Sequence, residues 1–76
     1  MKGYVLINTR TGDAREVVRN LRRVKGVGAA HLTFGPYDIV AEVEADSVRA
    51  LGELITTAIQ PLPGVEETLT CLAVDE

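Results

Sequence analysis

Hydrophobic and polar positions change their period within the first third of the chain. Residues 3–8, GYVLIN, are apolar and β-branched enough for a strand with apolar side chains on both faces. A stripe at helical spacing follows, formed by Ala14, Val17, Val18, Leu21 and Val24. Asp13 and Glu16 have the spacing of a capping box at the start of this helix, and Gly26 can take the left-handed conformation at its end. The pattern therefore predicts a strand followed by an amphipathic helix.

The rest of the chain repeats this order after a hairpin. The runs VGAAHLTF and YDIVAEVEA predict two strands joined by Gly35 and Pro36 in a type II′ turn, because glycine accepts the positive φ of the first central position and proline suits the second. Asp46 is expected to cap a second helix. The apolar stripe of that helix is formed by Val48, Leu51, Leu54, Ile55, Ala58 and Ile59. Residues 61–64, PLPG, end it, and VEETLTCLAV predicts the last strand.

An internal repeat supports the order βαββαβ. At an offset of 33 residues Tyr4 matches Tyr37 and Asp13 matches Asp46, and two apolar helix positions coincide as well. After a short insertion, KGV at 25–27 pairs with PGV at 63–65. This order is the split-βαβ plan of the ferredoxin-like α+β fold, in which right-handed crossovers place two helices on one face of a four-stranded antiparallel sheet.

The other face of the predicted sheet has no chain left to cover it. In the third strand, Ile39, Ala41 and Val43 are expected to face the helices. The first strand, however, is also apolar in its outward alternation, with Tyr4 and Leu6, and the last strand is apolar in both alternations. A second subunit packing sheet on sheet in an isologous dimer is the simplest cover for this surface.

Composition bounds the class of protein. Seventy-six residues, 46% of them hydrophobic and 25% charged, predict one small globular domain spanning residues 1–76. A net charge of −3 disfavours direct nucleic-acid binding. No apolar run approaches the roughly 20 residues that span a bilayer, and the N-terminus lacks a signal-peptide pattern, so we expect a cytoplasmic protein without a membrane partner.

Residues for catalysis, cofactors or metals are sparse. The chain has one histidine and one cysteine and lacks a G-x-S-x-G motif, a phosphate loop and closely spaced metal ligands. His31 and Cys71 both lie in predicted strands, where such single residues are usually structural. We therefore expect no enzyme, no catalytic residue, no metal site and no cofactor.

Two charged clusters have plain structural interpretations. The carboxylates of Asp38, Glu42 and Glu44 share one strand face, but successive positions on that face stand about 7 Å apart, too far for one cation to be held by all three. Arginines at helical spacing, Arg15, Arg19 and Arg22, are typical of the solvated side of an amphipathic helix.

Two motifs add to the predicted element order. Residues 34–38, FGPYD, lead into the hydrophobic third strand, and residues 62–70, LPGVEETLT, lead into the last one. Together, from Gly3 to Val74, the chain resembles the C-terminal effector-binding domain of the Lrp/AsnC family, the leucine-responsive regulators. This domain is the RAM module, named for regulation of amino-acid metabolism. A full-length member begins with a helix-turn-helix DNA-binding domain, for which residues 1–76 have no room, so the resemblance implies a stand-alone RAM module.

The resemblance also implies an assembly and a ligand. Dimers would pack sheet to sheet and join into rings such as octamers, and the module would modulate full-length Lrp/AsnC regulators. In the family, an amino-acid effector sits in clefts between dimers, touched by the turn between strands two and three and by the last strand. Carried over to this sequence, the ligand-binding candidates are Gly35, Tyr37, Asp38, Thr68 and Thr70. Carboxylate, hydroxyl and turn amide groups suit the two charges of an amino acid.

Each candidate has a structural alternative. Tyr37 can be an interface aromatic, Asp38 can bond the backbone of its own turn, and the two threonines are ordinary strand residues. Pro36 lacks an N–H, so a contact that relatives make through this amide is absent here. Three functions stay open: an amino-acid-binding regulatory module, a purely structural oligomerisation module, and an enzyme of the dimeric α+β barrel class.

Overall fold

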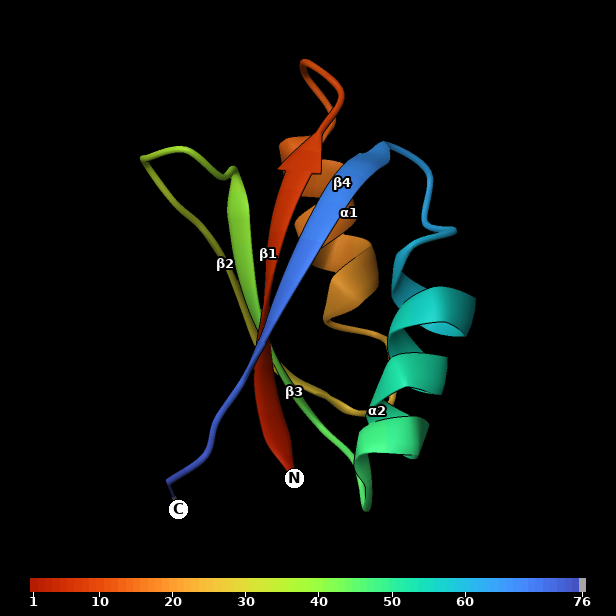
Figure 1. Ribbon diagram of the computed structural model, residues 1–76. Coiled ribbons are helices and arrows are strands. Elements are labelled where there is room, and N and C mark those ends of the chain that lie inside the picture. The colour runs from red at the N-terminus through yellow and green to blue at the C-terminus, as the bar shows by residue number, and fades with distance from the viewer. Residues whose placement is uncertain (76) are drawn as a thin grey trace.

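A four-stranded antiparallel sheet with both helices on one face forms the protein, as Figure 1 shows. The computed structural model describes residues 1–75. Its elements in chain order are β1 (Lys2–Thr9), α1 (Ala14–Leu21), β2 (Val27–Leu32), β3 (Ile39–Glu44), α2 (Val48–Leu54), the π-helical turn η1 (Ile55–Ile59) and β4 (Val65–Leu72). The strand order is β2-β3-β1-β4, so β2 and β4 are the edge strands. The predicted ferredoxin-like βαββαβ fold is confirmed.

The core lies between the sheet and the helices. It contains the predicted helix stripes and the inner alternations of three strands: Val5, Ile7, Val17, Val18, Leu21, Ala30, Ile39, Ala41, Val43, Leu51, Ile55 and Ile59. Burial of these side chains supplies most of the favourable free energy of folding. One member of the predicted second stripe, Val48, is exposed instead: it is the first residue of α2 and borders an open hollow between α2 and β4.

Both predicted helix caps need correction. Asp13 is the N-cap of α1, but its side chain makes no capping bond, because its Oδ2 accepts from Arg10 Nε at 2.9 Å. The capping box is therefore absent. Ser47, and not Asp46, caps α2, with its hydroxyl oxygen accepting from the N–H of Ala50 at 3.0 Å.

The second helix is also less regular than its stripe predicts. Its last turn, Ile55–Ile59, is π-helical, and the N–H of Gln60 donates to the carbonyl of Ile55 at 2.8 Å. The hydroxyl of Thr57 donates to the carbonyl of Glu53 at 2.6 Å across the start of this turn. Hydroxyls that bond backbone carbonyls in this way often accompany distorted helices.

The predicted two-residue turn at Gly35 and Pro36 is a six-residue loop, residues 33–38. Strand β2 ends at Leu32 and β3 begins at Ile39, because Thr33 and Asp38 close the loop at its base. The N–H of Thr33 donates to the carbonyl of Asp38 at 2.9 Å. Gly35 does have the predicted positive φ, at +140°. We refer to residues 33–38 as the β2–β3 loop.

Rows of opposed residues define the sheet face that no helix covers. One row joins His31, Val40, Leu6 and Leu69, and the next joins Ala29, Glu42, Tyr4 and Cys71. Directly opposed residues of neighbouring strands share a face. Tyr4 and Leu69 remain exposed large hydrophobics in the single chain. The predicted uncovered apolar surface is therefore present, and we call it the open face.

Candidate functional site

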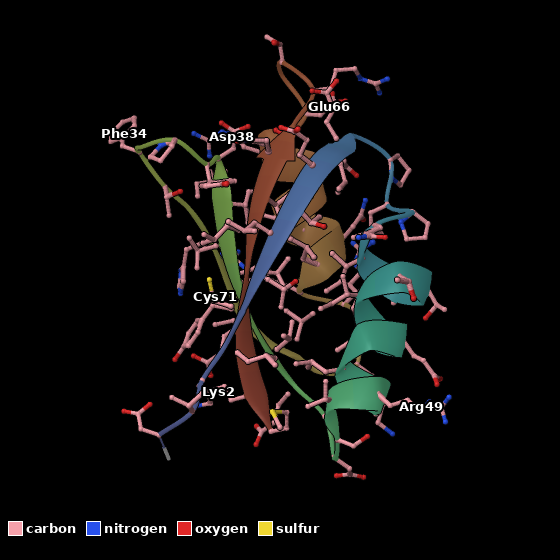
Figure 2. All side chains as sticks on the ribbon, in the orientation of Figure 1. Lys2, Phe34, Asp38, Arg49, Glu66 and Cys71 are labelled. Atoms are coloured by element: carbon pink, nitrogen blue, oxygen red, sulfur yellow. The ribbon has the colours of Figure 1, made fainter. Side chains whose placement is uncertain are left out.

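Three of the predicted site residues lie in the β2–β3 loop, at the end of the sheet where Figure 2 labels Phe34 and Asp38. Gly35 and Tyr37 line a shallow hollow together with Leu6 and Val40 of the open face. Phe34, at the tip of the loop, is fully exposed and points away from the rest of the chain. The loop therefore presents aromatic and apolar surface beside the open face.

Asp38 is already engaged within the subunit. Its Oδ2 accepts from the backbone N–H of Thr9 at 2.9 Å and from the Thr9 hydroxyl at 3.2 Å. Its own N–H donates to the carbonyl of Ile7 at 3.0 Å. The predicted alternative, a bond to the backbone of its own turn, is thus wrong for the carboxylate: Asp38 fastens the loop to the end of β1. Both side-chain bonds use one oxygen, so within residues 1–75 Oδ1 has no bonding partner.

The loop offers few free amide donors. The N–H groups of Thr33 and Asp38 are used inside the subunit, and Pro36 has none. Among the described residues this leaves the amides of Phe34, Gly35 and Tyr37 as donors for a ligand. A carboxylate could accept from these three groups, as anions do in other concave turns.

Thr68 and Thr70 lie on the helix-facing side of β4, because they oppose the buried Ile7 and Val5 of β1. Thr68 is half-buried, and its hydroxyl oxygen accepts from the side-chain amide of Gln60 at 3.1 Å. Thr70 is exposed and lines an apolar hollow between β4 and α2, with Leu51, Ile55 and four other residues.

The five candidates do not converge in one subunit. Three different hollows, of about 310, 420 and 360 Å³, are lined by Gly35 with Tyr37, by Thr68 and by Thr70, and Asp38 lines none of the three. Strands β3 and β1 separate the loop end of β2 from β4. A small molecule therefore cannot touch both sets of residues within one chain.

The charged groups that could suggest a cation site are dispersed. Asp38 is bonded to Thr9, and Glu42 lies 3.6 Å from the ammonium of Lys2 across the open face. Among residues 1–75 no cluster of three or more histidine, cysteine, aspartate or glutamate side chains is arranged to hold a metal ion. The described helices include none that is long and apolar enough to cross a membrane.

With the fold and these surfaces in view, sequence comparison identifies the family. The sequence model of one protein family, the Lrp/AsnC ligand binding domain, matches residues 2–76. The chain belongs to this family. The Lrp/AsnC ligand binding domain is a regulatory module of transcription regulators rather than a catalytic domain, which agrees with the predicted resemblance to the RAM module.

Related proteins fall into two size classes. The HTH-type transcriptional regulator PH1916 of Pyrococcus horikoshii is 29% identical over 59 residues, which are 78% of this chain and 39% of the relative. The chain thus spans about two fifths of the length of the curated regulators it matches. Two solved structures are instead matched over nearly their whole length. FFRP-DM1 is 32% identical with a TM-score of 0.91, and the match covers 96% of this chain and 97% of FFRP-DM1. TTHA0845 from Thermus thermophilus is 32% identical with a TM-score of 0.92, and the match covers 99% of this chain and 94% of TTHA0845.

The fold extends to distant family members. The structure of E. coli AsnC superposes with a TM-score of 0.92 at 22% identity, over 99% of this chain and 51% of AsnC. The chain therefore has the same fold as about half of AsnC.

Two residues that matter around the site escaped the sequence analysis. Thr9, the partner of Asp38, lies 29 residues away, and nothing local in the sequence connects the two. Gln60, the partner of Thr68, follows the second helix in a segment that the pattern describes only as its end. A signal for Gln60 does exist, because the KGV and PGV motifs align it with Arg22, another residue that reaches across to an edge strand.

Proposed function

We propose that this Lrp/AsnC domain is an amino-acid-binding regulatory module whose ligand site is formed between subunits. The observation that carries the proposal is the separation of the five candidates within one subunit, although the sequence motifs of the family contain all of them. A site that uses both the β2–β3 loop and β4 is complete only where two copies meet.

Assembly of the chain with itself is supported by the open face. Leu6, Val40, Leu69 and Tyr4 form a contiguous apolar surface across three strands, and a second sheet is the partner that would bury it. Phe34 is a second uncovered contact at the loop tip. The open face and the loop tip beside it together suit a dimer that joins further dimers into a ring, such as an octamer.

The loop has the chemistry that an amino acid requires. Oδ1 of Asp38 can accept from an α-ammonium group, and the amides of Phe34, Gly35 and Tyr37 can donate to an α-carboxylate. The hollow beside Leu6 and Val40 can take an apolar side chain. A distant relative with the same fold, NMB0573 from Neisseria meningitidis, was solved as a complex with L-Met, which supports an amino acid as the ligand class.

The proposed partners are full-length Lrp/AsnC regulators in the cytoplasm. The curated relatives are HTH-type transcriptional regulators, and this chain matches the part of them that corresponds to the ligand-binding domain. Ligand-dependent mixing of the module with such regulators would change their assembly. FFRP-DM1 and TTHA0845 are solved chains of about this length that share the fold almost end to end.

A thermal titration against each of the twenty amino acids tests the proposal. A ligand that binds only the native assembly stabilises it by mass action and so raises the melting temperature. At a ligand concentration of 100 times the Kd, the added free energy of unfolding is about 2.7 kcal/mol. A concentration-dependent rise with one or a few amino acids is expected. A flat response at millimolar ligand, from protein shown to be folded and oligomeric, would refute amino-acid sensing at ordinary affinities.

Two substitutions at Asp38 separate its structural role from ligand contact. In Asp38→Asn the amide oxygen can still accept from Thr9, but the charge that would pair with an α-ammonium is gone. We expect Asp38→Asn to fold and assemble while losing amino-acid affinity by about tenfold or more, whereas Asp38→Ala also loses about 1–3 kcal/mol of stability. Unchanged affinity in Asp38→Asn would assign the residue to the loop attachment alone.

A purely structural oligomerisation module is the second candidate, and the Asp38–Thr9 attachment favours it. If the loop serves only packing, substitutions there change the assembly and no amino acid binds. Sizing of Asp38→Asn and Thr70→Val by light scattering, beside the titration, distinguishes the two functions. Thr70→Val keeps the shape of the side chain and removes only the hydroxyl.

A further inference from the structure

Basic side chains are concentrated on one short segment of an acidic chain. Residues 14–25 carry five of the eight basic residues and one of the eleven acidic ones, so this segment has a net charge of +4 while the whole chain has −3. The remainder of the protein is accordingly strongly negative. Such a separation of charge creates a local positive potential that attracts anions.

Three of these residues border a groove between α1 and the edge strand β2. The groove holds about 270 Å³ and is lined by Arg15, Val18, Arg19, Arg22, His31 and Leu32. Its cationic walls come from one face of α1, where the arginines follow helical spacing. Arg19 also forms an exposed pair with Glu16, which costs little to exchange for a stronger partner.

Arg22 is held in position by the sheet edge. Its Nη2 and Nε donate to the carbonyl oxygen of Ala30 at 2.8 and 3.2 Å. Both bonds are charge-assisted, so the guanidinium is fixed while its remaining N–H groups stay free to donate. Preorganisation of this kind lowers the entropic cost of binding a ligand.

The same contact shows which backbone groups face the groove. In an antiparallel edge strand, the N–H and C=O of one residue point to the same side, and alternate residues point outward. Because Arg22 reaches the carbonyl of Ala30 from outside the sheet, Leu32, two residues further on, also directs its N–H and its C=O outward, and Leu32 lines the groove. The carbonyl of Ala30 is occupied by Arg22. The groove thus combines three guanidinium groups with one edge N–H donor and one carbonyl acceptor.

We propose that the groove between α1 and β2 binds a small phosphate-bearing anion, such as phosphate, pyrophosphate or the phosphate group of a metabolite. A phosphate group carries multiple charges and several acceptor oxygens, which match several guanidinium groups and an edge amide better than one carboxylate does. The helices lie on the face of the sheet opposite the open face, so a sheet-to-sheet dimer leaves Arg15 and Arg19 of α1 accessible (Figure 1). The site is independent of the proposed amino-acid site.

Calorimetric titration of the full chain with sodium pyrophosphate tests the proposal, with sodium chloride at equal ionic strength as the reference. Arg15→Gln removes one groove charge, and Arg49→Gln removes one charge from α2, which contributes no residue to the groove lining. Both side chains are exposed, so both variants should fold. We expect saturable binding that weakens by roughly tenfold in Arg15→Gln and changes less than about twofold in Arg49→Gln.

Three results would overturn the proposal. One is the absence of saturable binding up to about 10 mM pyrophosphate. Another is equal weakening in the two variants, which would indicate a response to total charge. A third is Arg15-dependent binding of a short DNA duplex that is far tighter per phosphate than the binding of pyrophosphate, since the groove would then serve nucleic acid.

Parallel titrations with a nucleoside diphosphate and with inorganic phosphate distinguish the sources of the phosphate group. Tighter binding of the nucleotide supports a metabolite, and equal binding supports the free anion.

Discussion

Substitution of Gly64 by alanine gives a sharp test of the turn that leads into β4. Gly64 has a φ of +93°, and a Cβ at this position would lie 2.9 Å from Cβ of Asp13 and 3.1 Å from Cγ2 of Val17. Neither atom is the far end of a flexible side chain, so relief requires movement of α1 or of the turn. The carbonyl of Gly64 also accepts from the N–H of Arg10 at 2.8 Å. Movement would weaken this bond between the two loops.

The magnitude follows from two separable costs. An L-residue at a positive φ costs about 1–2 kcal/mol relative to glycine. Overpacking in a site that cannot relax costs about 1–3 kcal/mol more. Gly12→Ala provides the matched control, because Gly12 has a φ of +88° and nothing within 4 Å of the added Cβ. Replacing glycine by alanine also reduces the conformational entropy of the unfolded chain, which stabilises the protein slightly. This effect is the same in both variants and cancels when their free energies of unfolding are compared.

Thermal and urea unfolding at one fixed protein concentration measures both variants. We expect Gly64→Ala to lose about 2–5 kcal/mol and Gly12→Ala about 1–2 kcal/mol, with about 4–8 °C in melting temperature per kcal/mol for a chain of this size. Gly26→Ala should fall between them, because its contact at 2.9 Å is with Cδ2 of Leu54, which can rotate away. Equal losses in Gly64→Ala and Gly12→Ala would refute the packing argument and leave only the backbone term.

Three further predictions address assembly and capping. Leu69→Asp places a charge on the open face and should dissociate dimers, as measured by sedimentation velocity. Val48→Asp, at a similarly exposed apolar position on α2, should leave the dimers intact. Dissociation by both variants would contradict sheet-to-sheet pairing. Phe34→Ser should reduce higher oligomers to dimers in light scattering without lowering the stability of the subunit, since its ring contacts solvent in the single chain; an unchanged oligomer would remove the loop tip from the interface. Ser47→Ala should cost about 1 kcal/mol in urea unfolding, because the N–H of Ala50 loses its partner, and no loss would show that the cap contributes nothing.

Periodicity was sufficient to predict the layers of this fold. Most of the predicted helix stripes and the inner alternation of β3 are buried or pack against the core, with Val48 as the exposed exception, because side-chain period and burial are linked by geometry. The last strand was ambiguous from its sequence, which is apolar in both alternations. Pairing with β1 resolves it: Leu69 and Cys71 face outward, and Thr70 and Leu72 face the helices. Register between distant strands is information that a local pattern does not contain.

The candidate site was harder to predict than the fold. Motif resemblance could select Asp38, but only the folded chain shows that its carboxylate bonds Thr9. The prediction of a two-residue turn was wrong for a related reason. The bond from Thr33 to Asp38 closes a wider loop, and no turn residue in the sequence indicates this bond. Asp46 and Ser47 are both good capping residues, and the choice between them depends on where tertiary packing begins the helix.

The internal repeat relates the two edges of the sheet and shows how they differ. Before each edge strand the same bonds recur, from Val27 N–H to the carbonyl of Val24 and from Val65 N–H to that of Leu62. These pairs are offset by 38 residues, five more than the offset of 33 in the first part of the repeat, and η1 contains five residues. Because the offset is still 33 at Leu21 and Leu54, the five extra residues fall between Leu54 and Leu62, a segment that includes η1.

The same offset of 38 aligns Arg22 with Gln60 and Ala30 with Thr68. Both helices therefore end with a side chain that reaches the neighbouring edge strand, Arg22 to a backbone carbonyl and Gln60 to a hydroxyl. The two contacts differ in charge: the first fixes a guanidinium beside β2, and the second is a neutral bond to Thr68 on the helix-facing side of β4. The two repeats thus give two different sheet edges. The β2 edge carries a fixed guanidinium that suits anions, and the β4 edge carries threonine hydroxyls that can bond a ligand. This difference is why the proposed phosphate site and the β4 side of the proposed amino-acid site belong to opposite halves of the chain.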